Sequence, residues 1–485
     1  MTLPRSTYRL QFTNGMDFAR AQQRVPHLEE LGVSHLHVSP VMSAVPGSSI
    51  GHAVIDPNEI DPALGGLLGL RQLAGALRAK GIGLILDILA DCMAASLENP
   101  WWHSVVTWGE ESPYARYFDI DWSTKLTLPV LERDFAEELA DGAMRLAFDP
   151  HRGVLAMEYR EGYYPLHPET CRQALAVQED LLLLTGRADA FDGTAALSGT
   201  IAFAGLQETS HALVDILREP ERIAAVHEAQ PWRLISRRAA GRHLSYRRGG
   251  DDLERVGLRM EDARVFDACH RLVLTLVRDG TVDGVRVLGI DALADPRTYL
   301  ERLRAAIGRN AYLAVDKQPG HGERMADWPI DAVVGDEDAS ADAAQIDGSA
   351  LEAAKRRILT DTLENERIRL TREAKVMADQ VDADFSRSSL AEAISALIVA
   401  LRVGRTYVTA ASVSEVDREI IATARQQAQD GTRPEVREAI DFIWELLADD
   451  KVPEALAGCA AFRARFQQLS SAVTARALAG ARGQR

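Results

Sequence analysis

Four side chains capable of acid–base or nucleophilic chemistry stand at or near the ends of predicted strands. Asp91 and Cys92 directly follow the apolar run 81–89, Asp316 ends a later run, and His52 lies in an earlier loop. Catalytic groups of parallel α/β folds gather at the carboxyl ends of the strands, so these four could share one cleft. Carboxyl and imidazole groups transfer protons, and a thiol can attack an electrophile or, with a histidine, bind a metal. These four side chains could therefore support proton transfer, nucleophilic attack or metal binding in that cleft.

Cys92 also has a structural interpretation. Free cysteines are among the residues most often buried, and a small thiol fills space as an apolar group does. The four cysteines of the chain are scattered and match no metal-binding spacing. The sequence therefore favours a small buried Cys92, and we expect no metal and no other cofactor.

The run 284–288 combines a charged side chain with an apolar one near a strand end. Alternation along a strand puts Arg286 and Leu288 on the same face. Arg286 could bind a ligand together with Asp87 of an earlier strand, or the two could form a buried salt bridge between adjacent strands, which we favour. Leu288 carries a hydrocarbon and can neither attack nor donate a proton. Asp291 carries a carboxylate that could in principle take a catalytic role that Leu288 cannot, but it belongs to the following turn.

Two adjacent tryptophans, Trp101 and Trp102, allow two interpretations. Their rings could stack on sugars, or they could form the small core of their own segment. Aromatic pairs serve both purposes, so both alternatives stay open.

Charge and composition exclude two classes of partner. The 485 residues carry a formal net charge of −16, whereas nucleic acids and anionic membranes attract clustered Lys and Arg. No signal-peptide pattern opens the chain, and no run approaches the ~20 apolar residues of a membrane span. With 46% hydrophobic residues, the chain can bury a large core. We therefore expect a soluble, cytoplasmic, globular protein that binds neither nucleic acid nor membranes.

Short apolar runs alternate with helical periodicity, which predicts an α/β fold with a parallel sheet, an α/β barrel with insertions. Strands are expected near 6–12, 33–40, 81–89, 284–288 and 311–316, and the run 400–408 reads as a further strand or a link. We expect four parts: 1–94 as the first part of the barrel, 95–250 as an inserted lobe, 251–345 as the second part of the barrel, and 346–485 as a mainly helical part that contributes late barrel elements.

Ten short segments occur in a fixed order: STYRLQ at 6–11, GVSHL at 32–36, PGS at 46–48, DP at 56–57, LGG at 64–66, NPWW at 99–102, FDIDW at 118–122, LADP at 293–296, RTYV at 405–408 and RFQQ at 465–468. In this order they resemble the maltooligosyl trehalose synthase family, over essentially the whole chain. The resemblance implies a (β/α)8-type TIM barrel of the α-amylase kind, complete or incomplete, with a lobe inserted after the third strand and a helical C-terminal part. It also implies the family's activity, an intramolecular transglycosylation that turns the reducing-end α-1,4 linkage of a maltooligosaccharide into an α,α-1,1 linkage.

The resemblance also assigns catalytic positions, and the residue types there depart from the family. The family's nucleophile corresponds to Leu288, the histidine after it to Gly289, the general acid Glu to Asp316, and a third carboxylate to Gly480. In a covalent mechanism, loss of the nucleophile costs several orders of magnitude in rate. Asp316 could still act as an acid. It is one methylene shorter than Glu, however, and a displacement of ~1 Å can cost on the order of a hundredfold.

Substrate-binding positions depart in the same way. The family's Tyr and Asp after the Pro-Gly-Ser loop correspond to His52 and Ala53, and its Asn-His pair corresponds to Asp91 and Cys92. Scaffold motifs survive while the positions of one site change together. We interpret this as a site that is either lost or rebuilt.

Three functions follow as alternatives. The favoured one is a pseudoenzyme that keeps an α-glucan or oligosaccharide-binding cleft, or has a regulatory or structural role linked to trehalose or glycogen metabolism. The second is an active isomerase of the family, with Asp316 and an unrecognised second group. The third is an enzyme with different chemistry in the same cleft, which would use Asp91, Cys92, His52 and Asp316.

Two kinds of partner are expected. The small-molecule partner would be a maltooligosaccharide or a related sugar. Members of the family normally continue beyond the segment that matches this chain, so apolar faces and sheet edges would stay uncovered here. We therefore expect a homo-oligomer, most simply a two-fold dimer, or a protein partner.

Overall fold

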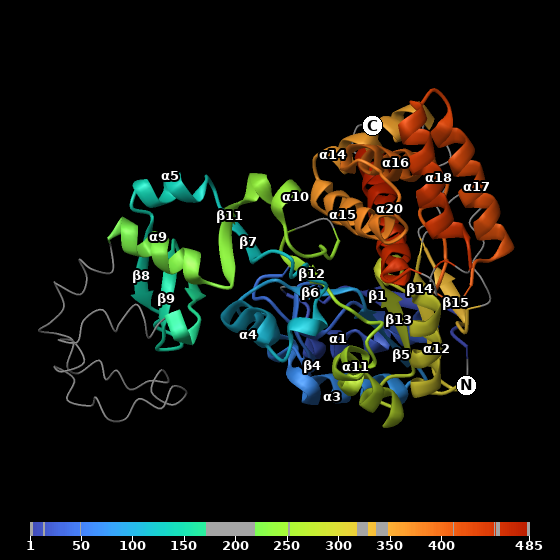
Figure 1. The fold of residues 1–485 in the computed structure, drawn as a ribbon. Coiled ribbons are helices and arrows are strands. Elements are labelled where there is room, and N and C mark those ends of the chain that lie inside the picture. Colours follow the sequence, from blue (N-terminus) through green and yellow to red (C-terminus); the bar gives the residue numbers. More distant parts are fainter. Residues whose placement is uncertain are drawn as a thin grey trace, which may run out of the picture. The chain divides into compact units, whose positions relative to one another are not determined.

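The computed structural model describes residues 3–12, 15–48, 50–170, 219–250, 253–317, 328–335, 348–410, 412–450, 452 and 456–482 of the 485 (Figure 1). Its contacts divide the chain into two compact units. One unit comprises 1–95 and 247–485, and the other comprises 96–246. The four-part division expected from the sequence is a different partition and stays a prediction.

The first unit is built on a parallel sheet of six strands in the order β1-β2-β5-β13-β14-β15. Its strands are β1 (Thr7–Leu10), β2 (His35–Val38), β5 (Gly83–Leu89), β13 (Gly284–Leu288), β14 (Tyr312–Asp316) and β15 (Ala332–Val334). All neighbouring pairs are parallel, and Arg286 lies opposite Asp87 on one side and Ala314 on the other. The sheet curls as an open part of a barrel, so the predicted α/β barrel-type fold is confirmed in an incomplete form.

The central strands form because their apolar runs can be buried on both faces, as parallel sheets require. Every residue of β13 is buried, and β5 is buried from Leu84 to Ile88. Residues 401–408, for which a strand or a link was expected, form a link without strand pairing. The carboxyl ends of β5, β13 and β14 therefore meet at one edge of the sheet.

Helices between the strands begin at residues suited to capping. The Asp262 side chain accepts a hydrogen bond from the Arg264 amide at the start of α11 (Ala263–Arg278), and Asp295 caps α12 (Pro296–Ile307). Apolar residues recur along α11 at helical spacing and are buried, among them Phe266, Val273 and Leu276. The remaining helices of this part are α1 (Phe18–Gln23), α2 (Val25–Glu30) and α3 (Gly66–Arg78).

Two short antiparallel pairs extend the loops of the sheet. The first pairs β3 (Met42–Ala44) with β4 (Val54–Ile60), and the second pairs β6 (Cys92–Ala94) with β12 (Arg255–Gly257). The second pair follows Asp91 directly, and the Leu258 amide donates to the Asp91 carbonyl at 2.8 Å. These bonds hold the segment just past the end of β5.

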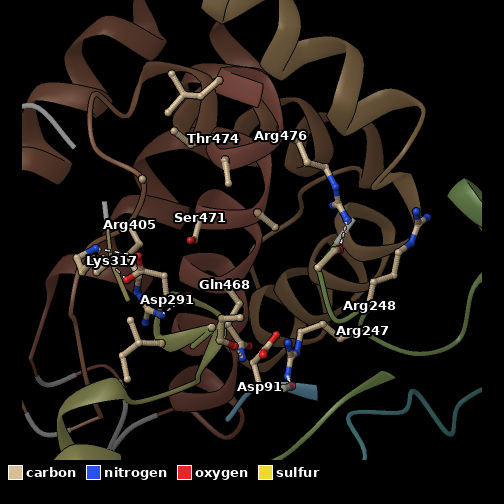
Figure 2. Close-up of a pocket in the computed structure, with 18 of the residues that line it drawn as sticks. Asp91, Arg247, Arg248, Asp291, Lys317, Arg405, Gln468, Ser471, Thr474 and Arg476 are labelled. Carbon is tan, nitrogen blue, oxygen red and sulfur yellow. Dashed lines mark hydrogen bonds and ion pairs between the residues drawn. The ribbon is translucent and has the colours of Figure 1, made fainter. Parts of the chain in front are cut away.

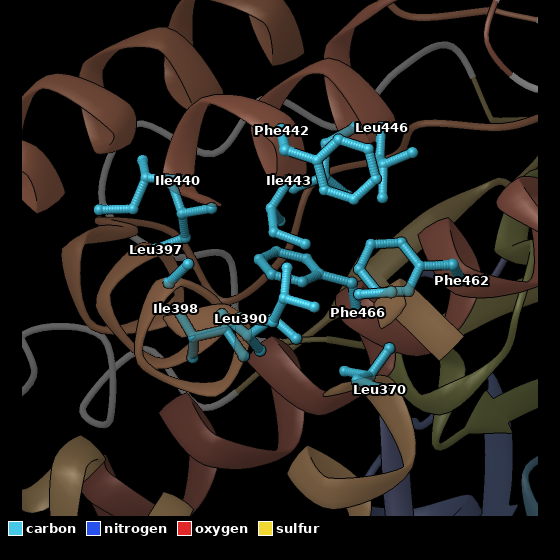
Figure 3. Close-up of a cluster of buried hydrophobic side chains, with 14 of the residues drawn as sticks. Leu370, Leu390, Leu397, Ile398, Ile440, Phe442, Ile443, Leu446, Phe462 and Phe466 are labelled. Atoms are coloured by element: carbon cyan, nitrogen blue, oxygen red, sulfur yellow. The ribbon is translucent and has the colours of Figure 1, made fainter. Parts of the chain in front are cut away.

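The C-terminal part of the first unit is helical, as predicted. It comprises α14 (Gly348–Thr360), α15 (Glu364–Gln380), α16 (Arg387–Ala400), α17 (Glu415–Gln429), α18 (Pro434–Ala448) and α20 (Cys459–Arg482). Figure 3 shows their shared core, where Leu370, Leu397, Ile443, Phe462 and Phe466 are almost completely buried. In the described part of the chain, no helix is long and apolar enough to cross a membrane.

The second unit contains a parallel strand pair and a three-stranded antiparallel sheet. The pair is β7 (Leu126–Leu131) with β11 (Trp232–Ser236), and the sheet is β8 (Met144–Phe148), β9 (Leu155–Tyr159) and β10 (Gly162–Pro165). Its helices are α4 (Pro100–Trp108), α5 (Phe135–Ala140), α9 (Pro220–Ala229) and α10 (Ala240–His243). Within this unit, Trp102 is buried and packs edge-on against Phe118 and Tyr246, at centroid distances of 5.3 and 5.2 Å.

Candidate active site

Asp87 lies in β5 and interacts with side chains from three other strands. Arg286 of β13 makes a bidentate ion pair with it, Nε to Oδ1 at 2.7 Å and Nη2 to Oδ2 at 2.9 Å. His37 Nε2 lies 2.6 Å from Oδ1, and Arg9 Nη2 donates to Oδ2 at 3.1 Å. Burial alone would raise the pKa of Asp87, but the hydrogen bonds from His37 and Arg286 outweigh burial and lower it. The salt bridge between Asp87 and Arg286 is therefore present, while a role of either in substrate binding stays a prediction.

Asp316 ends β14 and is the next carboxylate beyond this network. Its Oδ1 lies 4.0 Å from Arg286 Nη1, and its side chain is 45% exposed. Burial raises the pKa of Asp316, and the positive charge of Arg286 opposes that rise. An accessible carboxyl group with a raised pKa suits a proton donor.

Leu288 and Gly289 mark the carboxyl end of β13. Leu288 lies opposite Leu89 in register and is 7% exposed. Gly289 adopts a φ of +72°, and a Cβ atom there would lie 2.2 Å from Asp91 Oδ1. The Asp91 carboxyl group therefore occupies the space that a side chain at Gly289 would need, and the two residues depend on each other sterically.

Asp91 and Cys92 are buried next to each other. Burial raises the pKa of Asp91, and the positive charges of Arg247 and Arg255 oppose the rise. Cys92 is 1% exposed, its Sγ lies 3.5 Å from Asp91 Oδ1, and burial raises the pKa of the thiol well above its usual range. A Cβ atom at Gly249 would lie 2.1 Å from Cys92 Cβ. This tight, fully buried environment and the raised thiol pKa favour the structural interpretation of Cys92 over a nucleophile.

His52 is neutral at neutral pH. Burial, followed by the positive charge of Arg255, lowers its pKa to about 4. Among the described residues, no group of three or more His, Cys, Asp and Glu side chains is arranged to hold a metal ion.

A cavity of about 400 Å³ lies at the carboxyl ends of β5, β13 and β14 (Figure 2). Three aspartates line it, Asp91, Asp291 and Asp316, and α20 contributes a further wall with Gln468, Ser471 and Thr474. Its lining also includes five cationic side chains, Arg247, Arg248, Lys317, Arg405 and Arg476, and the carboxylate of Glu366. The volume lies within the range of about 300–1,000 Å³ that is typical of small-molecule sites.

The sequence interpretation missed the importance of Asp291. Lys317 Nζ donates to both of its carboxylate oxygens, at 2.9 and 2.8 Å, and the Tyr407 hydroxyl donates to Oδ1 at 3.2 Å. Arg405 is 1% exposed and donates to the carbonyls of Asp291 and Leu293 at 2.6 and 2.8 Å. The RTYV segment at 405–408 was visible in the sequence, but only the fold shows that it meets the turn after β13.

The structure brings only part of the predicted set together at this cavity. Asp91 and Asp316 line it, and Gly289 lies beside Asp91. Gly480 lies in α20, is exposed, and is not among the described lining residues. Trp101 and Trp102 belong to the second unit, where Trp101 stacks on Tyr114 at a centroid distance of 5.6 Å. These contacts favour the interpretation of the tryptophan pair as part of the lobe's own core.

Comparisons with known proteins agree with this architecture. A putative maltooligosyl trehalose synthase of Mycobacterium tuberculosis is 34% identical over 327 residues, which are 64% of this chain and 34% of that protein. The solved maltooligosyltrehalose synthase from Arthrobacter ramosus superposes with a TM-score of 0.72 at 28% identity, over 98% of this chain and 55% of the other. This chain belongs to the maltooligosyl trehalose synthase family.

Further comparisons support the fold. A hypothetical maltooligosyl trehalose synthase of Sulfolobus tokodaii gives a TM-score of 0.68 at 25% identity, over 98% of this chain and 55% of the other. No family model matches the chain. The chain thus spans about half of these solved structures and 34% of the curated relative. The cavity lies at the strand ends, where Asp316 and Gly289 are among its lining residues.

The first prediction concerns Asp87. Asp87→Asn should lower the free energy of unfolding by about 3–5 kcal/mol near pH 7, because it leaves the buried Arg286 without its countercharge. Chemical denaturation followed by circular dichroism measures the loss. Glu29→Gln, which removes an exposed ion pair with Lys80, is the matched control and should cost less than about 1 kcal/mol.

The Asp87 effect should also depend on pH. Because the folded state lowers the pKa of Asp87, its contribution is complete above the unfolded-state pKa of about 4 and is lost as the pH falls below it. The difference between the wild type and Asp87→Asn should therefore shrink on acidification. A difference under 1 kcal/mol at pH 7 would contradict the account.

The second prediction tests the contact between Gly289 and Asp91. Gly289→Ala should cost about 1–2 kcal/mol from its positive φ alone, and more from the clash with Asp91. Asp91→Ala removes the clash but not the backbone strain. A double-mutant cycle in denaturant should therefore give an interaction energy on the order of 1–3 kcal/mol, whereas additivity within about 0.5 kcal/mol would show that the two residues do not meet.

Proposed function

We propose that this member of the maltooligosyl trehalose synthase family binds an α-glucan or a related oligosaccharide in the cavity above β5, β13 and β14, and does not transfer glycosyl groups. The observation that carries the proposal is Leu288 at the end of β13, at the position that the family resemblance gives to the nucleophile. Retaining glycosyl transfer needs a carboxylate there, about 5 Å from a second carboxyl group. A hydrocarbon side chain cannot form the covalent intermediate.

The other catalytic positions support the same proposal. Asp316 stands at the acid position and, with its raised pKa, could still donate a proton. Gly480, at the position of the third carboxylate, has no side chain and lies on an exposed part of α20. An acid without a nucleophile does not complete the double displacement.

The cavity lining supports binding of a neutral, polar ligand. Sugars are recognised by side chains that donate and accept hydrogen bonds, and Gln468, Ser471 and Asp291 offer such groups. Among the described residues, Arg405 Nη2 and Thr474 Oγ1 are buried polar atoms of the lining residues that have no hydrogen-bond partner. Buried polar groups are normally satisfied, so a polar ligand or bound water would stabilise this wall.

A second candidate function is acid–base chemistry by Asp91 and Asp316. Both carboxyl groups line the same cavity, and burial raises the pKa of each. Pairs of titratable groups with shifted pKa values are typical of active sites, although structural networks also produce them. This candidate predicts hydrolysis rather than isomerisation, and requires both aspartates.

The third prediction separates these functions by activity on maltohexaose. Neither loss nor gain of reducing ends should exceed background, because Leu288 cannot take part in transfer. Asp316→Asn is the matched control, since it removes the remaining acid without changing size. Loss of reducing ends that disappears in Asp316→Asn would establish an active isomerase, and a gain that needs both Asp91 and Asp316 would establish the second candidate.

The same preparation tests binding. Isothermal titration calorimetry with maltohexaose should give saturable binding that Ser471→Phe weakens at least tenfold, because Ser471 projects into the cavity (Figure 2). Ala479→Phe, on the exposed side of the same helix, is the control and should bind as the wild type does. If the wild type does not bind maltohexaose, the proposal that the cavity binds an oligosaccharide is wrong.

The expected homo-oligomer or protein partner is also proposed. The two edge strands of the six-stranded sheet, β1 and β15, carry partly exposed side chains, among them Tyr8 at 38% and Val334 at 37%. Exposed edges of parallel sheets are usually paired or covered. A two-fold dimer that covers one of these edges is the simplest arrangement.

A further inference from the structure

A second cavity lies in the helical part of the first unit, among α14, α16, α17 and α18. Its volume is about 830 Å³. Apolar side chains form part of its lining, among them Leu351, Ala396, Val399 and Val436. Charged side chains also line it: Glu352, Lys355, Arg356, Arg367, Glu392, Arg402 and Asp430. The cavity does not include any residue discussed for the candidate active site, so it is a separate feature of the fold.

A buried cation, Lys355 of α14, lines this cavity. The residue is 2% exposed, and its Nζ donates to the carbonyl of Leu401 at 2.7 Å and to that of Ile398 at 3.4 Å. These carbonyls belong to the C-terminal end of α16, whose partial negative charge favours a cation. Burial lowers the pKa of Lys355 to about 8, so the ammonium form still predominates at neutral pH.

The hydrogen-bond acceptors of Lys355 are neutral, and Glu352 acts on its charge only from beyond ion-pair distance. Within the described ranges, no carboxylate oxygen lies within ion-pair distance of its Nζ, and two carbonyl acceptors serve three N–H donors. Two charged pairs that include lining residues of the cavity differ in this respect. Arg356 pairs with Glu352 at 3.3 Å and Arg433 pairs with Glu392 at 2.7 Å, and all four side chains are about half exposed or more. A buried cation in the lining of a cavity is thus left with one donor for a ligand.

We propose that this cavity binds a small ligand with an apolar body and one anionic group, and that the anionic group pairs with Lys355. Burying an unpaired charge is costly, and an anion beside it recovers that cost in a medium of low dielectric constant. The apolar lining supplies the remaining free energy by covering hydrocarbon surface. The ligand class is therefore an amphipathic carboxylate, sulfonate or phosphate, and not an oligosaccharide.

The experiment uses a matched pair of fluorescent probes on the full chain. The probe 8-anilinonaphthalene-1-sulfonate carries an anionic group, and N-phenyl-1-naphthylamine has the same apolar body without it. The wild type should bind the sulfonate at one site at least tenfold more tightly than Lys355→Met does. Both proteins should bind the neutral probe within about twofold of each other, because its apolar contacts are unchanged.

Arg356→Met is the control variant, since it removes a neighbouring cation that is already paired and exposed. It should leave sulfonate binding within about twofold of the wild type. Equal sulfonate binding by the wild type and Lys355→Met would overturn the proposal and leave Lys355 as a cap of α16 only.

A measurement on the wild type keeps the test decisive if Lys355→Met does not fold. The chain has six lysines, so amine acetylation can be followed residue by residue with mass spectrometry. Saturating sulfonate probe should slow acetylation of Lys355 at least fivefold, while acetylation of the exposed Lys80 stays unchanged. Protection of neither lysine, or of both equally, would contradict a site at Lys355.

Discussion

The ion pair between Asp87 and Arg286 is the interaction on which the sheet and its site depend. It joins the two central strands β5 and β13 through two short hydrogen bonds in a buried environment. His37 and Arg9 extend it across β2 and β1, so one carboxylate connects four strands. A buried charge with this many partners tolerates little displacement, because each lost contact leaves an unpaired group in a medium of low dielectric constant. The ion pair therefore supports the register of β5 and β13, and this register places the residues at the carboxyl ends of the two strands.

This network is separate from the residues that line the cavity at the strand ends, apart from its contact with Asp316. The network lies below the strand ends and contacts Asp316 only at 4.0 Å, so it does not require a particular side chain at 288 or 289. At the strand ends neighbouring residues fit each other sterically. Gly289 makes room for the Asp91 carboxyl group, and Gly249 makes room for Cys92. Both contacts leave no room for a larger side chain at position 249 or 289.

Much of the fold could be predicted from the sequence. The apolar runs at 81–89 and 284–288 are strands because they can be buried on both faces, and the pairing of Asp87 with Arg286 followed from their places on adjacent strands. The residues of the cavity could be predicted only in part. Asp291 looked like a turn residue, and its partners Lys317 and Arg405 are 26 and 114 positions away. Contacts of this kind depend on where α20 and the 401–408 link pack, which local periodicity does not encode.

The same limit applies to Gly480, Trp101 and Lys355. Gly480 was assigned by the family resemblance alone, and the structure places it on an exposed part of α20, where it is not one of the described lining residues of the cavity. From the sequence, sugar stacking and a local core were equally good interpretations of the tryptophan pair. The contacts of Trp102 with Phe118 and Tyr246 favour the local core. Nothing in the sequence indicated that Lys355 is buried, because a lysine in an amphipathic helix is ordinarily exposed. Its burial depends on the tertiary packing of α14 against α16.

The central claim is that Leu288 prevents a glycosyl-enzyme intermediate in a fold that otherwise matches the family. The most direct measurement is the intact mass of the protein after incubation with a 5-fluoro-maltosyl fluoride, which slows breakdown of such intermediates and traps them. The account predicts that the mass of 53.1 kDa stays unchanged, while the maltooligosyltrehalose synthase from Arthrobacter ramosus serves as the family control. A stoichiometric gain of one maltosyl unit, mapped by peptide sequencing to Asp91, Asp291 or Asp316, would contradict it.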